Sequence, residues 1–275
     1  MIMRVFEKAR AAVQETSPLI HCITNPISIN DCANAVLALG AKPIMAEHPR
    51  EVEGITEIAK ALAVNLGNIT DARAESILLS GKKAAESGIL SVIDVVGAAC
   101  SPFRMELAQT FIRECAPAVI KGNLSEIKAV AGVSYETVGI DVGSRDAVTG
   151  QNQAALNRAA ELVKNYAKSV GAVVTASGAI DIVSDGQEVY LIENGRPEMA
   201  KVTGTGCMLN VIIGTYLSVT NPLTASLLAT VTLGISGEIA DSSRGTGSYR
   251  VGLIDALSTM NDMQLKSMIK LKKIS

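Results

Sequence analysis

The sequence contains no tryptophan, and aromatic residues make up only 3% of its 275 positions. Its charges are almost balanced, because 25 basic residues face 27 acidic ones and leave a net charge of −2 at pH 7. Proteins that bind nucleic acids present basic surfaces and, for single strands, aromatic rings on which bases stack. We therefore expect no nucleic-acid partner and no general attraction to anionic membranes.

Long apolar runs are also absent. The two most hydrophobic segments, 207–219 and 223–235, contain glycine, threonine or serine and are separated by "TNP". Neither provides the roughly 20 uninterrupted apolar residues that span a membrane. The N-terminal segment "MIMRVFEKARAAVQET" has the pattern of an amphipathic helix and lacks the apolar core of a signal peptide. These features predict a soluble, cytoplasmic protein.

The cysteines are few and widely spaced, and no two of them form a C-x-x-C pair. They are Cys22, Cys32, Cys100, Cys115 and Cys207. An odd number at such spacing favours reduced thiols over a disulfide framework or a zinc site. We expect Cys32, Cys100 and Cys115 to be buried as small apolar residues, and only the position of Cys207 favours a function.

The first half of the chain alternates short apolar runs with segments of helical periodicity. The predicted strands are 18–24, 41–46, 61–67, 89–96 and 117–123, and the predicted helices between them are 29–40, 52–61, 72–88 and 105–115. This cadence indicates βαβ units. Because the strands do not alternate apolar with polar residues, both faces of the sheet are expected to be covered. The fold class is therefore α/β with a mostly parallel central sheet.

The pattern changes in the second half. Three short runs at 171–177, 180–186 and 188–195 are separated by tight turns, which predicts an antiparallel meander at one end of the sheet. Two apolar helices are expected at 205–219 and 222–241, both buried. The segment 133–150 is expected to be a surface loop before a helix that starts near Gln153. No linker or repeat divides the chain, so residues 1–275 are expected to form one domain.

Polar residues follow several of the predicted strands. Thr24 and Asn25 follow the first, Asp94 ends the fourth, and Lys121 lies near the end of the fifth. Ligands of open α/β sheets gather beyond the carboxyl ends of the strands. A candidate site is therefore expected at this edge. Asp94 would be costly to bury there unless it were paired or close to a metal ion.

A Gly204-Thr205-Gly206 turn precedes the first apolar helix. Glycines let the backbone approach a ligand closely, and the first turn of a helix offers free N–H groups to an anion such as phosphate. The alternative is a tight turn with no ligand. The turn lacks the Gly-Lys-Ser/Thr of a Walker A loop and the third glycine of a dinucleotide fingerprint.

Cys207 follows this turn directly. A position in the first turn of a helix lowers the pKa of a thiol. We therefore expect Cys207 to accept a proton from a substrate hydroxyl or to act as a nucleophile, with a buried structural cysteine as the alternative.

The segment "GNLSE" has two interpretations. Asn123 and Glu126 have the spacing of a helix capping box, which is the favoured explanation. Alternatively, Glu126 holds a water bound to Mg²⁺ beside phosphate oxygens. Lys121, just before this segment, could hold a phosphate as a point charge.

Taken together, these motifs resemble those of the hydroxyethylthiazole kinases, a family of the ribokinase-like superfamily. The resemblance covers about residues 18–255 and depends on "HCITNPISINDCANAVLALGAKPIMA", "VIKGNLSEI", "SGAIDIVSDG" and "KVTGTGC". It implies a three-layer ribokinase-like fold. It also implies an ATP-dependent kinase that phosphorylates the hydroxyl of 4-methyl-5-(2-hydroxyethyl)thiazole in thiamine biosynthesis and salvage.

The resemblance also implies residue roles on the side of the alcohol. Cys207 would be the catalytic residue, beside the hydroxyl to be phosphorylated. Gly204, Met45 and Asn25 would bind the thiazole. The family is trimeric with sites at subunit boundaries, so a homotrimer is expected.

On the nucleotide side, the resemblance assigns ATP binding to Lys121 and Ser177 and Mg²⁺ binding to Glu126 and Asp94. The implied anion hole is Gly204, Thr205 and Gly206. Lys121 replaces the family's usual arginine, which gives up bidentate hydrogen bonding. Ser177 replaces a threonine, and Val95 follows Asp94 where proline is common. These departures bear on nucleotide affinity more than on the type of reaction.

Two other functions fit the same motifs. Nucleotide-dependent NAD(P)H-hydrate dehydratases share the fold, but they carry an aspartate where this chain has Cys207. A regulator that binds thiazole or nucleotide without turnover is the second alternative.

Overall fold

The structure, a computed structural model, describes residues 2–133 and 153–274, so the predicted surface loop at 133–150 lies almost wholly outside the described residues. The described strands form one nine-stranded sheet with the order β2-β1-β3-β4-β5-β6-β7-β8-β9. The first six strands in this order are mutually parallel, and the last three pairings are antiparallel. The prediction of a mostly parallel sheet is confirmed.

The alternating first half of the chain also folds as predicted. Its strands are β1 (Leu19–Ile23), β2 (Lys42–Ile44), β3 (Ala61–Asn65), β4 (Ser91–Asp94) and β5 (Val119–Asn123). Its helices are α1 (Ile2–Thr16), α2 (Ile29–Ala38), α3 (Val52–Ile58), α4 (Asp71–Glu86), α5 (Pro102–Cys115) and α6 (Leu124–Val130). All five residues of β3 and all four of β4 are buried, which is why these strands show no apolar alternation.

The predicted meander is confirmed, with one extension. Strand β6 (Val173–Ser177) is parallel to β5, β7 (Asp181–Ser184) is antiparallel to β6, and β8 (Val189–Ile192) is antiparallel to β7. The C-terminal strand β9 (Leu271–Lys273) adds to β8 and was not predicted. Strand β9 has three residues and pairs with β8 alone. Its sequence "LKK" contains no apolar run from which a strand could be predicted.

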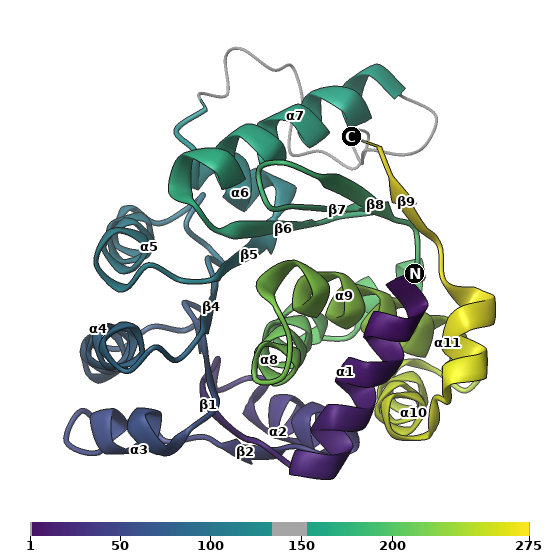
Figure 1. Cartoon of the computed structure of the whole chain (residues 1–275), viewed down its shortest axis with the longest axis horizontal. Helices are drawn as coiled ribbons and strands as arrows, with labels where there is room; N and C mark the ends of the chain where they lie inside the picture. The colour runs from purple at the N-terminus through teal and green to yellow at the C-terminus, as the bar shows by residue number, and fades with distance from the viewer. Residues whose placement is uncertain (1, 134–152, 275) are drawn as a thin grey trace.

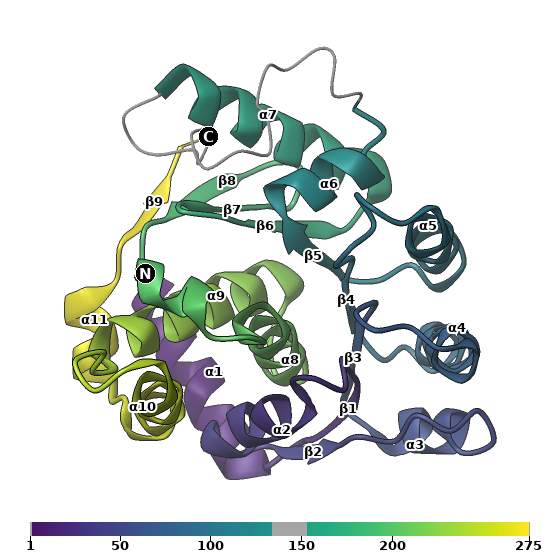
Figure 2. The same ribbon diagram turned by 180° about the vertical axis from the view of Figure 1, so that it is seen from behind.

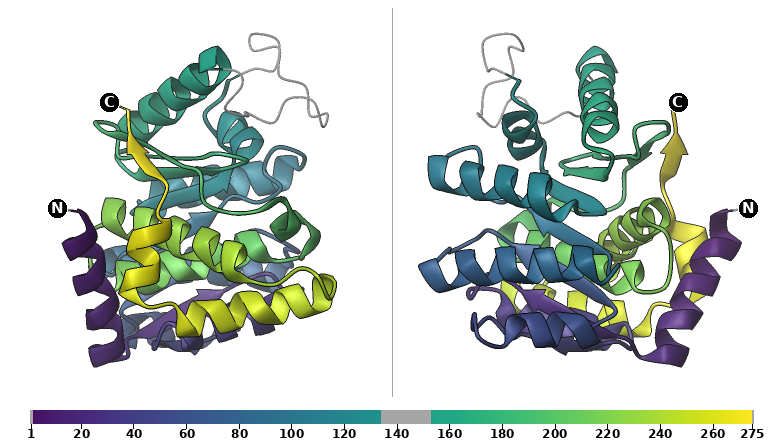
Figure 3. Two further views of the ribbon diagram at one scale, coloured as in Figure 1. Left: turned by 90° about the vertical axis from the view of Figure 1, so that its right-hand side faces the viewer. Right: turned by 60° about the vertical axis from the view of Figure 1, so that its left-hand side comes forward.

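Helices cover both faces of the sheet and make three layers (Figures 1 and 2). Helices α3 to α6 and α7 (Gln153–Val170) pack on one face and contribute to one core cluster. Helices α1, α2 and the C-terminal helices pack on the other face and form the second cluster. Figure 3 shows the helices of the first layer stacked side by side along the sheet. The three-layer prediction is confirmed.

Two of the C-terminal helices form the centre of the second layer. In α8 (Thr205–Leu217) every residue from Cys207 onward is buried. Among the described helices, α9 (Pro222–Ile239) is the one long and apolar enough to cross a membrane, but 72% of it is buried inside the protein. Burial of this kind is expected for a core helix of a soluble protein. Two further helices, α10 (Thr246–Thr259) and α11 (Asp262–Met268), were not predicted.

The start of α9 allows a test of the fold. Asn221 is its N-cap, and the side-chain Oδ1 accepts a hydrogen bond from Thr224 N at 2.9 Å. Replacing Asn221 with alanine leaves that N–H without its side-chain acceptor. We expect Asn221→Ala to lower the free energy of unfolding by about 1 kcal/mol in urea titrations. Asn221→Asp is the matched control, because aspartate keeps the acceptor. Superimposable curves for the alanine variant and the wild type would contradict this role.

Candidate functional site

The parallel strands bring the predicted polar residues to one edge of the sheet. Asn65 ends β3 and pairs in register with Asp94, which ends β4. Asp94 pairs in turn with Lys121 of β5. At the next strand, Asn123 pairs with Ser177 of β6. The sheet register therefore places four neighbouring strand ends side by side, as expected for a ligand-binding edge.

The Gly204–Gly206 turn lies against this edge. Gly204 is the N-cap of α8 with φ +92°, and a Cβ there would lie 2.6 Å from Ser28 Cβ. A Cβ on Gly206 would lie 3.0 Å from Lys121 Nζ. Glycine is favoured at position 204, where the backbone is left-handed and a Cβ would clash with Ser28. The predicted turn before the helix is confirmed, and its free N–H groups lie beside the buried ammonium group of Lys121.

Lys121 and Asp94 form a buried ion pair. Lys121 Nζ lies 2.9 Å from Asp94 Oδ2, and the two residues are 4% and 1% exposed. Burial raises the pKa of Asp94, with Lys121 acting in the opposite direction. Burial works to lower the pKa of Lys121, but the charge and hydrogen bond of Asp94, together with the charges of Glu126 and Cys207, outweigh it and raise that pKa. Of the two alternatives that the sequence left open for Asp94, a charged partner or a nearby metal ion, the structure shows the charged partner.

One oxygen of this carboxylate is left open. Asp94 Oδ1 is buried and has no hydrogen-bond partner among the described residues, whereas Oδ2 accepts from both Lys121 and Asn65. A buried acceptor without a partner is costly. Asp94 Oδ1 is therefore suited to receive a proton or a water molecule held by a cation.

Glu126 forms the predicted capping box with Asn123. Its Oε2 accepts from Asn123 N at 2.8 Å and Asn123 Oδ1 accepts from Glu126 N at 2.9 Å, so the capping box is confirmed. Its Oε1 accepts from Gly97 N at 2.9 Å. Within residues 2–133 and 153–274, no three His, Cys, Asp or Glu side chains group closely enough to hold a metal ion. Asp94 and Glu126 could thus hold Mg²⁺ only with water and ligand oxygens completing its shell, which suits that ion.

Cys207 lies in the first turn of α8, as predicted, but its pKa moves in the opposite direction from the prediction. Asn65 Nδ2 donates to Cys207 Sγ at 3.5 Å, and the residue is 8% exposed. Burial raises the pKa of the thiol, the nearby Asp94 charge raises it further, and Lys121 and hydrogen bonds oppose this only in part. The helix effect inferred from sequence is outweighed because the turn packs into the protein. At neutral pH the group is a thiol.

The remaining cysteines follow the prediction with one exception. Cys22, Cys32 and Cys115 are buried. Cys100 is exposed, contrary to expectation, because it lies in the loop after β4 and not on a packed face. Its Sγ donates to Gly97 O at 3.4 Å.

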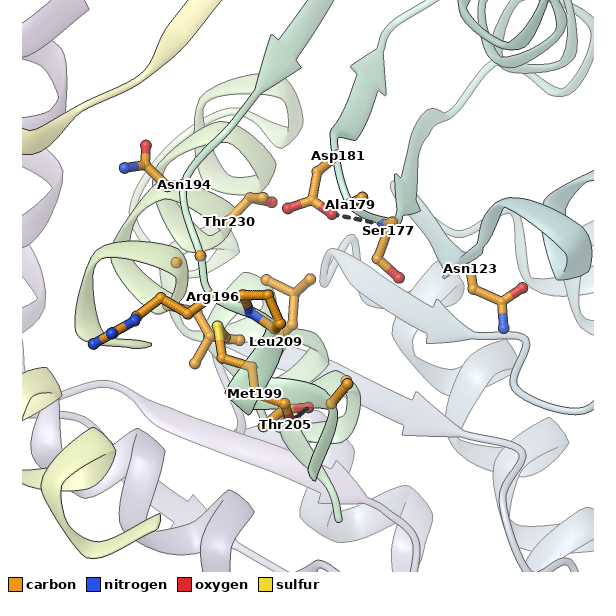
Figure 4. Close-up of a pocket in the computed structure, with 17 residues that line it drawn as sticks. Asn123, Ser177, Ala179, Asp181, Asn194, Arg196, Met199, Thr205, Leu209 and Thr230 are labelled. Atoms are coloured by element: carbon orange, nitrogen blue, oxygen red, sulfur yellow. Dashed lines mark hydrogen bonds between the residues drawn. The ribbon is translucent and has the colours of Figure 1, made fainter. Parts of the chain in front are cut away.

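A cavity of about 580 Å³ opens next to the turn. Ser177 and Asn123 line it from the strand ends, and Thr205 and Gly206 line it from the start of α8. Figure 4 shows the Asp181 carboxylate directed toward Thr230, with Thr205 at the other end of the cavity. Burial raises the pKa of Asp181 to about 7. Polar side chains line the cavity at both ends, and apolar residues such as Met199 and Leu209 line it between them, a mixture typical of a small-molecule site.

Neither Met45 nor Asn25 is among the described residues that line this cavity. Met45 is half-buried and packs against the core cluster of α8 and α9. Asn25 approaches the buried polar residues beside Gly67. A Cβ on Gly67 would lie 2.4 Å from Asn25 Nδ2. Asn25 O also accepts from Ser28 N at 2.9 Å, and Ser28 packs on Gly204. The predicted thiazole residues and the cavity are therefore separate parts of the site.

Two further residues at this edge, Asn65 and Arg73, were not predicted from the sequence. Asn65 joins Asp94 and Cys207 through one amide. Arg73, only 2% exposed, donates to the carbonyl oxygens of Thr24, Asn65, Gly67 and Asn68. The polar residue that ends the apolar run "ALAVN" could have identified Asn65. Nothing in the helical segment around Arg73 indicated a buried arginine.

Comparisons with known proteins agree with this geometry. Residues 11–263 match the sequence model described as "HK: Hydroxyethylthiazole kinase family". Hydroxyethylthiazole kinase 2 of Clostridium botulinum (strain Okra / Type B1) is 51% identical over 253 residues, which is 92% of this chain and 94% of that protein. Hydroxyethylthiazole kinase 1 of Methanosphaera stadtmanae is 42% identical over 274 residues, covering 95% of each chain.

Solved structures agree as well. The hydroxyethylthiazole kinase protein of Pyrococcus horikoshii OT3 superposes with a TM-score of 0.88 at 32% identity, over 99% of this chain and 100% of that one. The pyridoxal kinase of Staphylococcus aureus, in complex with AMP-PCP and pyridoxal, gives 0.61 at 14% identity over 94% and 98%, a likeness of fold alone. The predicted ribokinase-like fold is confirmed, and this chain belongs to the hydroxyethylthiazole kinase family.

Proposed function

We propose that this protein transfers the terminal phosphoryl group of ATP to the hydroxyl of 4-methyl-5-(2-hydroxyethyl)thiazole, a step of thiamine biosynthesis and salvage. Family membership supports the reaction. The observation that carries the residue roles is the buried Lys121–Asp94 pair, 2.9 Å long, beneath the glycine turn that opens α8. Phosphoryl transfer depends mainly on alignment and on stabilising charge, and this arrangement can supply both.

ATP is proposed to bind in the cavity of about 580 Å³. Its phosphates would lie at the end of the cavity where the N–H groups of Thr205 and Gly206 begin α8 and form the anion hole with Gly204. The Lys121 ammonium, beside Gly206, would hold a phosphate oxygen. Ser177 lines the same cavity, and its hydroxyl donates to Gly122 O at 3.3 Å. This fits a contact with the nucleotide.

The acidic residues fit a Mg²⁺ ion bound largely through water. Asp94 would offer its open Oδ1, and Glu126 would use the remaining lone pairs of a carboxylate already fixed by two backbone N–H groups. When bound, Mg²⁺ would neutralise charge on the phosphates. Lys121 remains paired to Asp94 Oδ2 and opposes the rise in the pKa of that carboxyl group that burial causes.

The thiazole is proposed to bind on the other side of the turn, against Asn25, Met45 and Gly204. Cys207 lies between this side and the buried ion pair, which suits contact with the acceptor hydroxyl. Because burial and Asp94 raise the pKa of the thiol, a preformed thiolate is scarce at neutral pH. We therefore assign Cys207 chiefly to orienting the hydroxyl toward the phosphate.

A homotrimer with sites at subunit boundaries is part of this proposal. Ile27 is 63% exposed and stands two residues after Asn25, one of the proposed thiazole-binding residues. A second copy of the chain would cover this apolar side chain and close the thiazole region.

The oligomer can be tested by light scattering coupled to size exclusion. We expect a mass about three times the 28.7 kDa of one chain. Ile27→Asp should lower it, because a charge at a buried contact is costly. Met263→Asp, at a side chain 77% exposed on α11, is the control and should not change the mass. A wild-type mass near that of one chain would refute the trimer.

The reaction can be tested by thiazole-dependent release of ADP from Mg-ATP. We expect saturable turnover with the hydroxyethylthiazole and much less with hydroxymethylpyrimidine, which serves as the control alcohol. No ADP above background at saturating thiazole would refute the kinase. Tight binding by calorimetry without turnover would instead favour a regulator.

The role of the thiol can be tested by substitution. Cys207→Ala should lower kcat by up to about 100-fold, the lower end of what proton-transfer groups contribute. Cys207→Asp should retain or exceed the wild-type rate. Cys115→Ala, which removes a buried thiol from α5, is the control.

The pH dependence of the reaction rate provides a second test of the role of the thiol. If the thiol accepts the proton, its raised pKa makes the wild-type rate climb with pH through neutrality and beyond pH 9. The carboxylate of Cys207→Asp would level the profile at lower pH. Equal rates and equal profiles for wild type, Ala and Asp would leave no proton-accepting role for the residue.

A further inference from the structure

We propose that Asn65 is a positioning residue for the transfer: its single amide fixes the Cys207 thiol and the Asp94 carboxylate relative to each other. The proposal rests on the function proposed above and adds a residue to it. Asn65 is fully buried at the end of β3, directly between these two groups.

The orientation of the amide is determined by its surroundings. Asn65 Oδ1 accepts from Gly67 N at 2.8 Å, so the NH₂ group must face the opposite way. There Nδ2 donates to Asp94 Oδ2 at 2.8 Å and to Cys207 Sγ at 3.5 Å. An amide has two N–H groups and one oxygen, so every polar function of the side chain is used. Flipping the amide would set an oxygen against the carboxylate.

These contacts control the faces that Asp94 and Cys207 present to ligands. Asp94 Oδ2 is engaged by both Asn65 and Lys121, which leaves Oδ1 as the open oxygen. The N–H donated to Cys207 Sγ occupies a lone pair of the sulfur and directs its S–H elsewhere. Asn65 therefore sets which atom of each group faces the reacting oxygens.

The backbone that carries Asn65 is itself clamped. Arg73 Nη2 donates to Asn65 O at 3.1 Å, and Arg73 Nη1 donates to Gly67 O at 2.6 Å. A Cβ on Gly67 would lie 2.9 Å from Asn65 Oδ1 and 2.4 Å from Asn25 Nδ2. The turn is thus held from both sides, so that the amide cannot shift without disturbing the thiazole region. A rigid support of this kind preserves alignment in the transition state.

The first test compares kcat and KM for the thiazole in two variants. Asn65→Asp keeps the size and the acceptor for Gly67 N but removes both donors, and Asn65→Ala removes all hydrogen bonds of the side chain. We expect each to lower kcat by about 100-fold, the cost of a displacement near 1 Å. The KM values for ATP and thiazole should change far less, because neither substrate is assigned a contact with Asn65.

Asn210 provides the matched control. It is a buried asparagine of α8, and its Nδ2 donates to Val64 O at 3.0 Å, one residue before Asn65. Within the described residues it has no hydrogen bond to Cys207 or Asp94. Asn210→Ala also removes a buried side-chain hydrogen bond and should leave kcat near the wild-type value, with the melting temperature of each variant recorded to measure any loss of stability. Equal losses of kcat in both variants would reduce Asn65 to a structural role and overturn the proposal.

A double-mutant cycle tests whether Asn65 acts through the thiol. In the Cys207→Ala background, Asn65→Ala should lower kcat by several-fold less than it does alone, because coupled groups are not additive. Full additivity would overturn the link to Cys207.

A second readout needs neither ATP nor thiazole, so it separates failure of this proposal from failure of the kinase assignment. In a Cys100→Ser background, which removes the exposed thiol, iodoacetamide alkylation of Cys207 is followed by peptide mass spectrometry at one pH. Loss of the N–H donor should slow alkylation several-fold in Asn65→Asp but not in Asn210→Asp. Unchanged alkylation in Asn65→Asp would overturn the proposal even if the wild type phosphorylates the thiazole.

Discussion

The buried ion pair between Lys121 and Asp94 is the interaction on which the rest of this site depends. Removing two charges from water costs free energy. An ion pair 2.9 Å long offsets that cost only when the remaining hydrogen-bond donors and acceptors of the two groups are also satisfied. Asn65 satisfies one of them, and Asp94 Oδ1 stays open. A pair kept at this cost beside a cavity is better explained by function than by stability, since well-packed apolar residues would serve the fold as well.

The rigid surroundings make this pair useful. Helix α8 is buried from Cys207 to its end, so its first turn is fixed relative to β3 and β4. Glycines at positions 204 and 206 let that turn pack closely against Ser28 and Lys121. The N–H groups, the ammonium group and the thiol thereby converge at one point between the cavity and the Asn25 region. Alignment of this kind is what phosphoryl transfer requires of a protein.

Much of this arrangement could be predicted from local sequence. The βαβ cadence placed Asp94 and Lys121 at strand ends, and "GTG" before an apolar helix marked the turn. What could not be predicted depended on tertiary packing. The pKa of Cys207 rises because the turn is buried beside Asp94, and a helix position considered alone gives the wrong sign. Glu126 belongs to the capping box and is also a buried carboxylate, and the spacing of residues in the sequence could not show that it is both. Strand β9, with its short polar sequence, exists only because β8 offers a free edge.

The most direct test of the central claim is a crystal structure with AMP-PCP, Mg²⁺ and the hydroxyethylthiazole. The account predicts the terminal phosphate over the N–H groups of Thr205 and Gly206, within hydrogen-bond distance of Lys121 Nζ. It also predicts the alcohol oxygen beside Cys207 Sγ, with Asp94 still paired to Lys121. A terminal phosphate bound away from the start of α8, with the buried ion pair contacting neither ligand, would contradict it.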